Sequence, residues 1–151
     1  MDDILSLLQD FDVAKLLPAP EDFVKDLELM MRIAVMAGPL ILLGLGLLFY
    51  LAPPKEANHS LGFRTYWGMG SMEAWQFTQR LAGMFYSVLG VGLTVIMSLL
   101  CNAFRFMSAM AMANTAIICV IIELVLILSV WLYINNKVRK TFDKDGNRRT
   151  K

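Results

Sequence analysis

The chain has 151 residues, of which 57% are hydrophobic and 18% are charged, and its formal net charge is +1. A soluble domain averages about 45–50% apolar and about 25% charged residues, so this composition disfavours an ordinary water-soluble domain. The charge near zero and the lack of a basic stripe interleaved with aromatic residues argue against a nucleic-acid-binding protein.

The first 32 residues predict an acidic, amphipathic segment that lies at the membrane interface. It consists of two short helices separated at Pro18 and Pro20, each with apolar residues near one face and Asp or Glu elsewhere. Helices of this kind lie on a membrane surface. Two interpretations remain open, a packing collar on the rest of the protein or a surface to which a partner binds.

Three apolar runs follow, at residues 33–52, 81–101 and 113–134. A bilayer core of about 30 Å needs about 20 helical residues to cross it, and each run is long enough. Because lipid offers no partners to the backbone, and the runs do not alternate apolar and polar residues, they predict α-helices. We expect an all-α integral membrane protein with a three-helix transmembrane bundle at residues 33–136, N-terminal amphipathic helices and a basic tail at residues 137–151.

Glycine and proline add detail to the first two spans. Glycines in both runs suit close helix packing in lipid and make a homo-oligomer plausible. Pro39 predicts a kink in the first span, and Pro53 and Pro54 end it.

Lys and Arg are concentrated in the tail and in the loop between the first two spans. Cytoplasmic segments of membrane proteins carry an excess of these residues. Three spans place the tail and this loop on the same side, so the two regions agree. We expect a multi-pass protein of the cell membrane, with its N-terminus outside and its C-terminus in the cytoplasm.

The loop before the second span, residues 58–83, is rich in side chains that do more than fill space. Ser71 stands where a helix N-cap is expected, and Glu73 falls in the first turn, where the helix dipole favours an anion. Trp75 and Gln79 are four residues apart and share one helix face, while Gln76 and Arg80 share the adjoining face.

This loop resembles the SdpI immunity-protein family of bacterial membrane proteins (SdpI/YhfL-like). The family pattern appears here as Asn58, Gly62-Phe63-Arg64-Thr65, Ser71-Met72, Trp75, Arg80 and Gly83. Phe63 replaces the usual Tyr. Members of the family protect the producing cell from a peptide toxin and can tether a regulator at the membrane. The resemblance therefore implies an immunity or signalling protein that contacts a peptide toxin or a regulatory protein, with the cytoplasmic loop as its binding surface.

Candidate partner- or anion-binding residues come from the same loop. They are Asn58, Gly62, Phe63, Arg64, Thr65, Ser71, Glu73, Trp75, Gln79 and Arg80. Arg64 either bonds to Glu73 or backbone carbonyls as a structural staple, or binds an anion such as a lipid phosphate through its guanidinium fork. Arg80 either extends its charge to the interface or takes part in the same anion site.

Glu123 is the single ionisable residue within the core of the third span. A charged side chain at the bilayer centre costs about 2.5–3.5 kcal/mol on insertion scales. Glu123 is therefore either protonated or bonded to one of four polar residues at neighbouring positions: Asn102, Asn114, Thr94 or Ser98. Its role is then to join helices or to serve a proton- or partner-linked function. The alternative to the immunity hypothesis is a small oligomeric transporter or channel, or a subunit of a membrane complex, that uses this residue.

No catalytic constellation is evident in the sequence. There is no Ser-His-Asp set, metal-ligand spacing or phosphate-binding glycine loop, so we expect neither an enzyme nor a bound metal or cofactor. An intramembrane enzyme that uses Arg64, Glu73, Arg80 and Glu123 is the weakest hypothesis, because Glu123 lies deeper than the other three.

Overall fold

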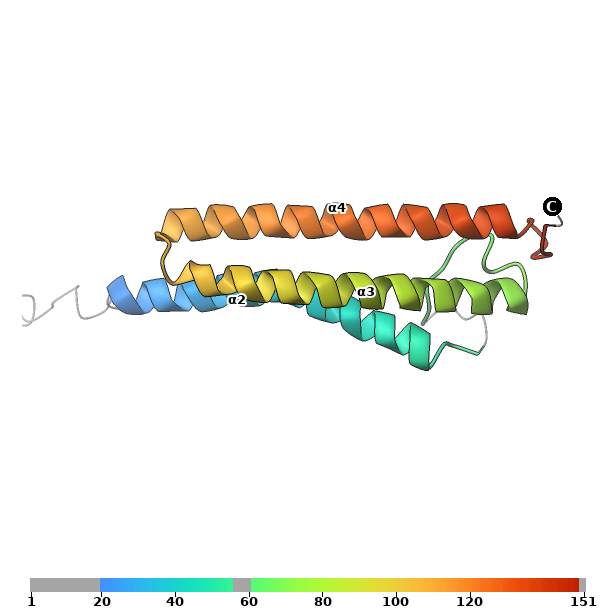
Figure 1. Cartoon of the computed structure of the whole chain (residues 1–151), viewed down its shortest axis with the longest axis horizontal. Coiled ribbons are helices and arrows are strands. Elements are labelled where there is room, and N and C mark those ends of the chain that lie inside the picture. The colour runs from blue at the N-terminus through green and yellow to red at the C-terminus, as the bar shows by residue number, and fades with distance from the viewer. Residues whose placement is uncertain (1–19, 56–60, 150–151) are drawn as a thin grey trace, which may run out of the picture.

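The computed structural model describes residues 20–55 and 61–149, which form three long α-helices. They are α2 (Pro20–Leu51), α3 (Met72–Phe104) and α4 (Ala109–Thr141). α2 and α4 run in one direction and α3 returns in the other (Figure 1). Each helix is long and apolar enough to cross a membrane. The predicted three-helix membrane bundle is confirmed, and the helices extend beyond the predicted spans.

α2 corrects the expectation of a separate second amphipathic helix before residue 33. Residues 20–32 are its first turns and continue without a break into the first span. Pro20 is the first helical residue, where a missing N–H costs no hydrogen bond, so it starts this helix. An ion pair of 2.6 Å between Glu28 and Arg32, four residues apart, supports the junction. The other predicted short helix lies outside the described residues.

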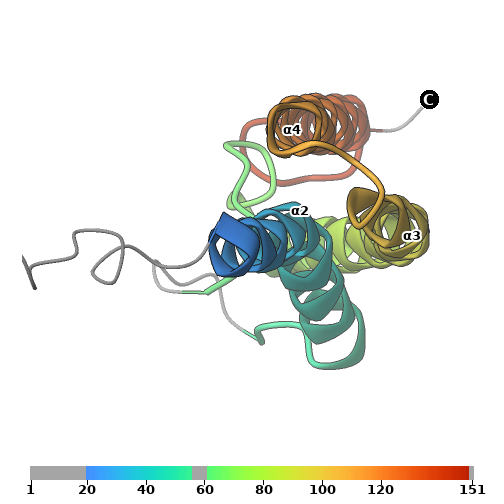
Figure 2. The ribbon, with the colours of Figure 1, turned by 90° about the vertical axis from the view of Figure 1, so that its left-hand side faces the viewer.

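Pro39 lies inside α2 and is fully buried. Proline has no N–H, so the carbonyl of Val35, four residues earlier, loses its helical donor. Figures 1 and 2 show the second half of α2 bending away from the line of its first half, as the predicted kink requires.

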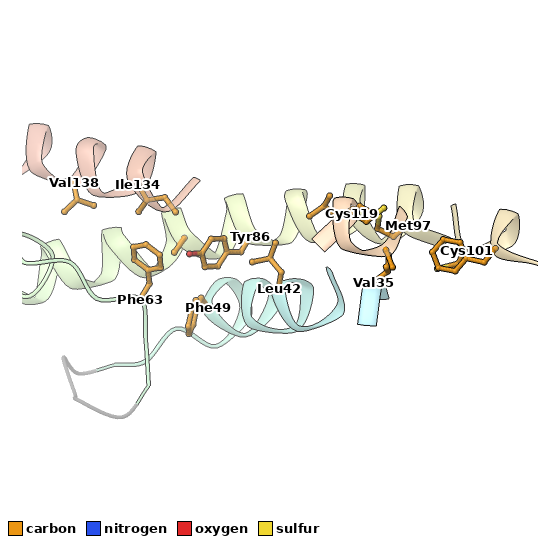
Figure 3. Packing of buried hydrophobic residues seen from close by; sticks show 14 of the residues in the cluster. Val35, Leu42, Phe49, Phe63, Tyr86, Met97, Cys101, Cys119, Ile134 and Val138 are labelled. Carbon is orange, nitrogen blue, oxygen red and sulfur yellow. The ribbon is translucent and has the colours of Figure 1, made fainter. Parts of the chain in front are cut away.

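The core of the bundle is a seam of side chains along the three helices (Figure 3). In α2 the buried positions are Val35, Pro39, Leu42, Gly46 and Phe49, which recur at spacings of four and three. This repeat keeps one face of a helix turned towards its neighbours, as in a coiled coil. Met31 and Met36 pack against the edge of this seam, and many other apolar side chains of α2 are exposed, where a bilayer would cover them.

Glycines bring α2 and α3 into backbone contact. A Cβ on Gly83 would lie 2.5 Å from the Tyr50 nitrogen, and one on Gly90 would lie 2.7 Å from the Leu43 Cα. A Cβ on Gly46 would meet the backbone of Ser87. Lipid supplies no hydrophobic drive between helices, so such close packing is what joins them. The predicted packing role is confirmed for these three glycines and is wrong for Gly44 and Gly92, where a Cβ would have nothing within 4 Å. The homo-oligomer stays a prediction.

The pair Gly44 and Gly46 offers a matched test of this packing. We expect Gly46→Ala to lower stability by about 1–3 kcal/mol, because the new methyl group overpacks the contact with Ser87. Gly44→Ala has open space around it and should change stability by no more than about 1 kcal/mol through helix propensity. Thermal unfolding in detergent measures both, and equal effects would contradict the assigned contact.

Candidate functional site

The loop at residues 61–71 folds back into one end of the bundle. Phe63 and Thr65 are only 7% and 5% exposed. The ring of Phe63 meets that of Tyr86 edge-on at 5.6 Å between centroids, and both belong to the same buried cluster as Ile134 (Figure 3). Figure 2 shows the loop running between α2 and α4. The loop is therefore a packed part of the bundle as well as a connection.

Gln79 holds this loop through both of its amide atoms. The Phe63 N–H donates to Gln79 Oε1 at 2.8 Å, and Gln79 Nε2 donates to the Phe63 carbonyl at 2.8 Å. Gln79 is fully buried. Irregular backbone inside a membrane protein is tolerated only where protein groups satisfy it. One side chain here satisfies both backbone groups of Phe63.

Trp75, one turn before Gln79, braces the loop from the same helix face. Its indole N–H donates to the Pro54 carbonyl at 2.8 Å and so connects the segment after α2 to α3. Gly62 lies against its ring with a φ of 127°, and a Cβ there would be 2.6 Å from Trp75 Cη2. Only glycine combines this backbone angle with this approach. The predicted shared face of Trp75 and Gln79 is confirmed.

A tight turn completes the inner side of the loop. The Thr65 hydroxyl accepts a hydrogen bond from the Gly68 N–H at 2.9 Å. A Cβ on Gly68 would lie 2.5 Å from Thr78 Oγ1, so the turn rests directly on α3. Ser71 then caps α3 as predicted, with its hydroxyl accepting from the Ala74 N–H at 3.1 Å.

The chain after α4 packs onto this loop, which the sequence did not predict. Ser71 Oγ donates to the Gly146 carbonyl at 2.7 Å, and Gly146, with a φ of 78°, lies against Gly70. Phe142 is fully buried and meets the Phe77 ring edge-on at 5.5 Å. The first residues of the predicted basic tail are the last turn of α4, and the residues after Thr141 form a folded turn. We call residues 61–71 and 142–149 together the cap.

The cap carries its charged groups on the outside. Arg64 is exposed between buried Phe63 and Thr65. Glu73 forms an ion pair with Arg148 of the tail, 3.6 Å from Nε to Oε1, and both side chains are more than half exposed. Such an exposed pair contributes at most about 1 kcal/mol.

Arg149 is held more firmly than Arg148. Its Nε donates to the Phe142 carbonyl at 3.0 Å, and its guanidinium lies 5.8 Å from the centre of the Trp67 ring. These contacts order one more cation on the surface of the cap.

Two hollows lie at this end of the bundle, mainly on α3. One of about 390 Å³ is lined by Glu73, Gln76, Arg80 and Arg148 together with apolar side chains such as Met84. A neighbouring hollow of about 480 Å³ shares Gln76 and Arg80 and adds Lys55. The predicted common face of Gln76 and Arg80 is therefore the exposed one.

The structure divides the predicted site residues into two groups. Arg64, Glu73 and Arg80 are exposed, while the following residues are partly or fully buried and support them: Gly62, Phe63, Thr65, Ser71, Trp75 and Gln79. Asn58 lies outside the described residues. The tail residues were missed, although the run Asp145-Gly146-Asn147 is a turn signal.

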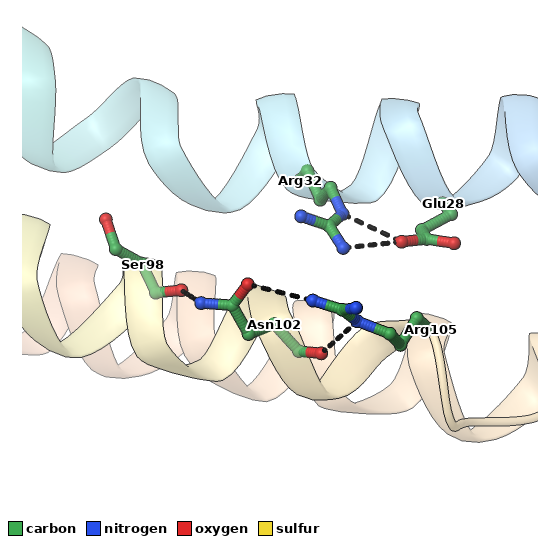
Figure 4. A network of polar contacts seen from close by, with 5 residues as sticks. All are labelled: Glu28, Arg32, Ser98, Asn102 and Arg105. Carbon is green, nitrogen blue, oxygen red and sulfur yellow. Dashed lines mark hydrogen bonds and ion pairs between the residues drawn. The ribbon is translucent and has the colours of Figure 1, made fainter.

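No hydrogen bond joins Glu123 to its expected polar partners. The Thr94 hydroxyl donates to the Gly90 carbonyl at 2.7 Å, and the Ser98 hydroxyl contacts Met36 Sδ at 3.8 Å. Asn102 bonds within its own end of α3, donating to the Ser98 carbonyl at 3.1 Å and accepting from Arg105 at 3.4 Å (Figure 4). Asn114 is exposed and precedes Glu123 by nine helical residues, roughly 14 Å. Neither asparagine is therefore hydrogen-bonded to Glu123, and no hydrogen-bonded path joins the three among the described residues.

A model of the SdpI/YfhL protein family matches residues 55–134, just over half of the chain. The chain belongs to the SdpI/YfhL family. The matched segment includes the loop of the cap, α3 and most of α4, so the resemblance first seen in the loop motif is confirmed. No curated protein and no solved structure matches the chain.

Replacing Gln79 tests the support of this SdpI-family loop. In Gln79→Leu the buried N–H and carbonyl of Phe63 lose their partners, and each unsatisfied group costs about 1–3 kcal/mol. We expect a clear drop in the thermal unfolding temperature. Gln76→Leu is the matched control on the exposed face, and it should leave that temperature nearly unchanged. Similar effects of the two variants would contradict the role given to Gln79.

Asp143 gives the tail turn a pH dependence. Its carboxylate accepts from the Asn147 N–H at 2.8 Å and the Asp145 N–H at 3.0 Å. The Asn147 bond is the main reason that the pKa of Asp143 is lowered. A depressed folded-state pKa adds stability that is present above the unfolded pKa and is lost as the pH falls through the folded value.

We therefore expect the turn to be closed at neutral pH and to open in acid. The amide NMR signal of Asn147 should move as Asp143 is protonated. In Asp143→Asn this titration should disappear, whereas it should remain in Asp145→Asn. A signal that moves identically in all three proteins would contradict the assignment.

Proposed function

We propose that this SdpI-family protein binds a partner through its cap and acts in immunity to a peptide toxin, in membrane sequestration of a regulatory protein, or in both. The proposed role is binding rather than catalysis. It includes the cytoplasmic orientation of the cap, with the N-terminus outside. The concentration of Lys and Arg at the cap end of the bundle supports this orientation.

The observation that carries the proposal is the division of the loop into a buried support and an exposed surface. Phe63 and Thr65 are packed inside, while Arg64 and the 73%-exposed Tyr66 point outwards from the same few residues. A loop already fixed in place loses little conformational entropy when a partner binds. Arg and Tyr are also the residue types that most often dominate binding interfaces.

The charge of the cap favours an acidic partner surface. Arg64, Arg80 and Arg149 lie around it, and Glu73 is already paired with Arg148. Complementary charge raises the rate of association and orients the partner. We therefore propose a regulatory protein with an acidic docking face as the cytoplasmic partner.

Co-purification from native membranes after mild cross-linking tests this role. We expect Arg64→Ala to lose the partner while expression is retained. Arg105→Ala at the opposite end of the bundle is the matched control and should retain the partner. An unchanged partner profile in Arg64→Ala would contradict the proposal.

The immunity role has a separate readout. Cells that lack the gene are exposed to culture supernatant of the parent strain, which contains any peptide toxin that this strain secretes. We expect reduced survival that the wild-type gene restores and the Arg64→Ala gene does not. Full survival of the deletion strain would argue against immunity without affecting the co-purification result.

A further inference from the structure

We propose that Glu123 is a proton-binding site inside the bundle, where its protonated carboxyl group donates a hydrogen bond to the backbone carbonyl of Val35 that Pro39 leaves without a donor. This site lies in the middle of the membrane, away from the cap, and goes beyond the proposed binding function. It joins α4 to the bend of α2.

α4 contributes to this site the buried carboxyl group of Glu123. Glu123 is near the midpoint of α4 and only 3% exposed, and its Oε1 has no hydrogen-bond partner among the described residues. Ionised side chains are costly in this environment unless another charge or several hydrogen bonds compensate them. Carrying a proton removes that cost.

No described cation next to Glu123 provides compensation. The titratable groups near Glu123 are Cys101 of α3 and Cys119 of its own helix, and Arg32 of α2 lies near Cys101. Arg32 precedes Gly38 by six residues and is bonded to Glu28 at 2.6 Å, as Figure 4 shows. The thiols are neutral at physiological pH.

The α2 side of the site supplies an acceptor. Val35 and Pro39 are both fully buried on the interior face of α2. Gly38 beside them has no side chain, and a Cβ there would lie 2.5 Å from Glu123 Oε2. The missing Cβ lets the carboxyl group approach the backbone of α2 at the turn where proline has freed a carbonyl.

The chemistry of this pair suits a proton rather than a metal ion. Ca²⁺ takes about six to eight oxygen ligands, whereas one carboxyl group and one carbonyl meet here. No group of three metal-binding side chains occurs in the described parts of the chain. A protonated acid supplies the single donor that the Val35 carbonyl lacks. An ionised one would place two acceptors against each other and weaken the α2–α4 contact.

Infrared difference spectroscopy on the purified protein in lipid tests the site directly. We expect the carbonyl band of a protonated carboxylic acid in the wild-type protein at neutral pH and its loss in Glu123→Gln. Glutamine has the same shape and can still donate to Val35, so this variant should fold. Glu28→Gln is the control that should retain the band. A spectrum of Glu123→Gln identical to wild type would overturn the proposal.

Pro39→Ala tests the acceptor. Alanine restores the N–H that bonds to the Val35 carbonyl, so the acid of Glu123 loses its partner. We expect the acid band to shift to higher frequency and to disappear at lower pH than in the wild-type protein. An unshifted band with an unchanged titration would show that Val35 is not the acceptor. Both readouts are independent of partner binding at the cap.

Discussion

The two hydrogen bonds between Gln79 and Phe63 are the constraint on which the cap depends. A chain that enters a membrane bundle outside a helix brings an N–H and a carbonyl that lipid cannot satisfy. Gln79, which is buried on α3, forms a hydrogen bond of 2.8 Å with each of these groups. Phe63 can then pack its ring inside, and its neighbour Arg64 is turned outwards. Arg64 can lie on the exposed surface of the loop because the buried backbone groups of Phe63 have hydrogen-bond partners.

The three helices are joined by different means at different depths. α2 and α3 meet backbone to backbone through glycines, of which Gly83 and Gly90 come from α3. α4 faces α2 through Glu123 at mid-depth, and at the cap end the tail returns to Ser71 at the start of α3. Because the tail and the loop meet at Ser71, a partner that binds the cap contacts segments attached to both α3 and α4. Movement of α4 relative to α3 would therefore change the binding surface.

Local chemistry was predictable from the sequence, and long-range pairing was not. Apolar length identified the spans, and the spacing of Trp75 and Gln79 showed that they share a helix face. That this face is buried and receives the loop was not predicted, since both residues were expected to bind a partner. The sequence divided one helix into an interfacial helix that ends at residue 32 and a span that begins at residue 33, because the charge ends there. α2 instead runs unbroken from Pro20 to Leu51. The contact of Ser71 with Gly146 joins residues 75 positions apart, and no periodicity carries that information.

The substitution of Phe63 for the tyrosine usual at this point of the SdpI motif follows from the same packing. Its ring is 7% exposed and meets Tyr86 edge-on, in the same buried cluster as the aliphatic side chain of Ile134. A hydroxyl buried among such groups would need its own hydrogen-bond partner or incur the cost of desolvation. Phenylalanine fills the same buried space and needs no hydrogen-bond partner. The backbone bonds to Gln79 are kept, since they do not involve its side chain. The motif residue therefore fixes the position of the loop, and the neighbouring exposed residues form the surface that the proposed partner would contact.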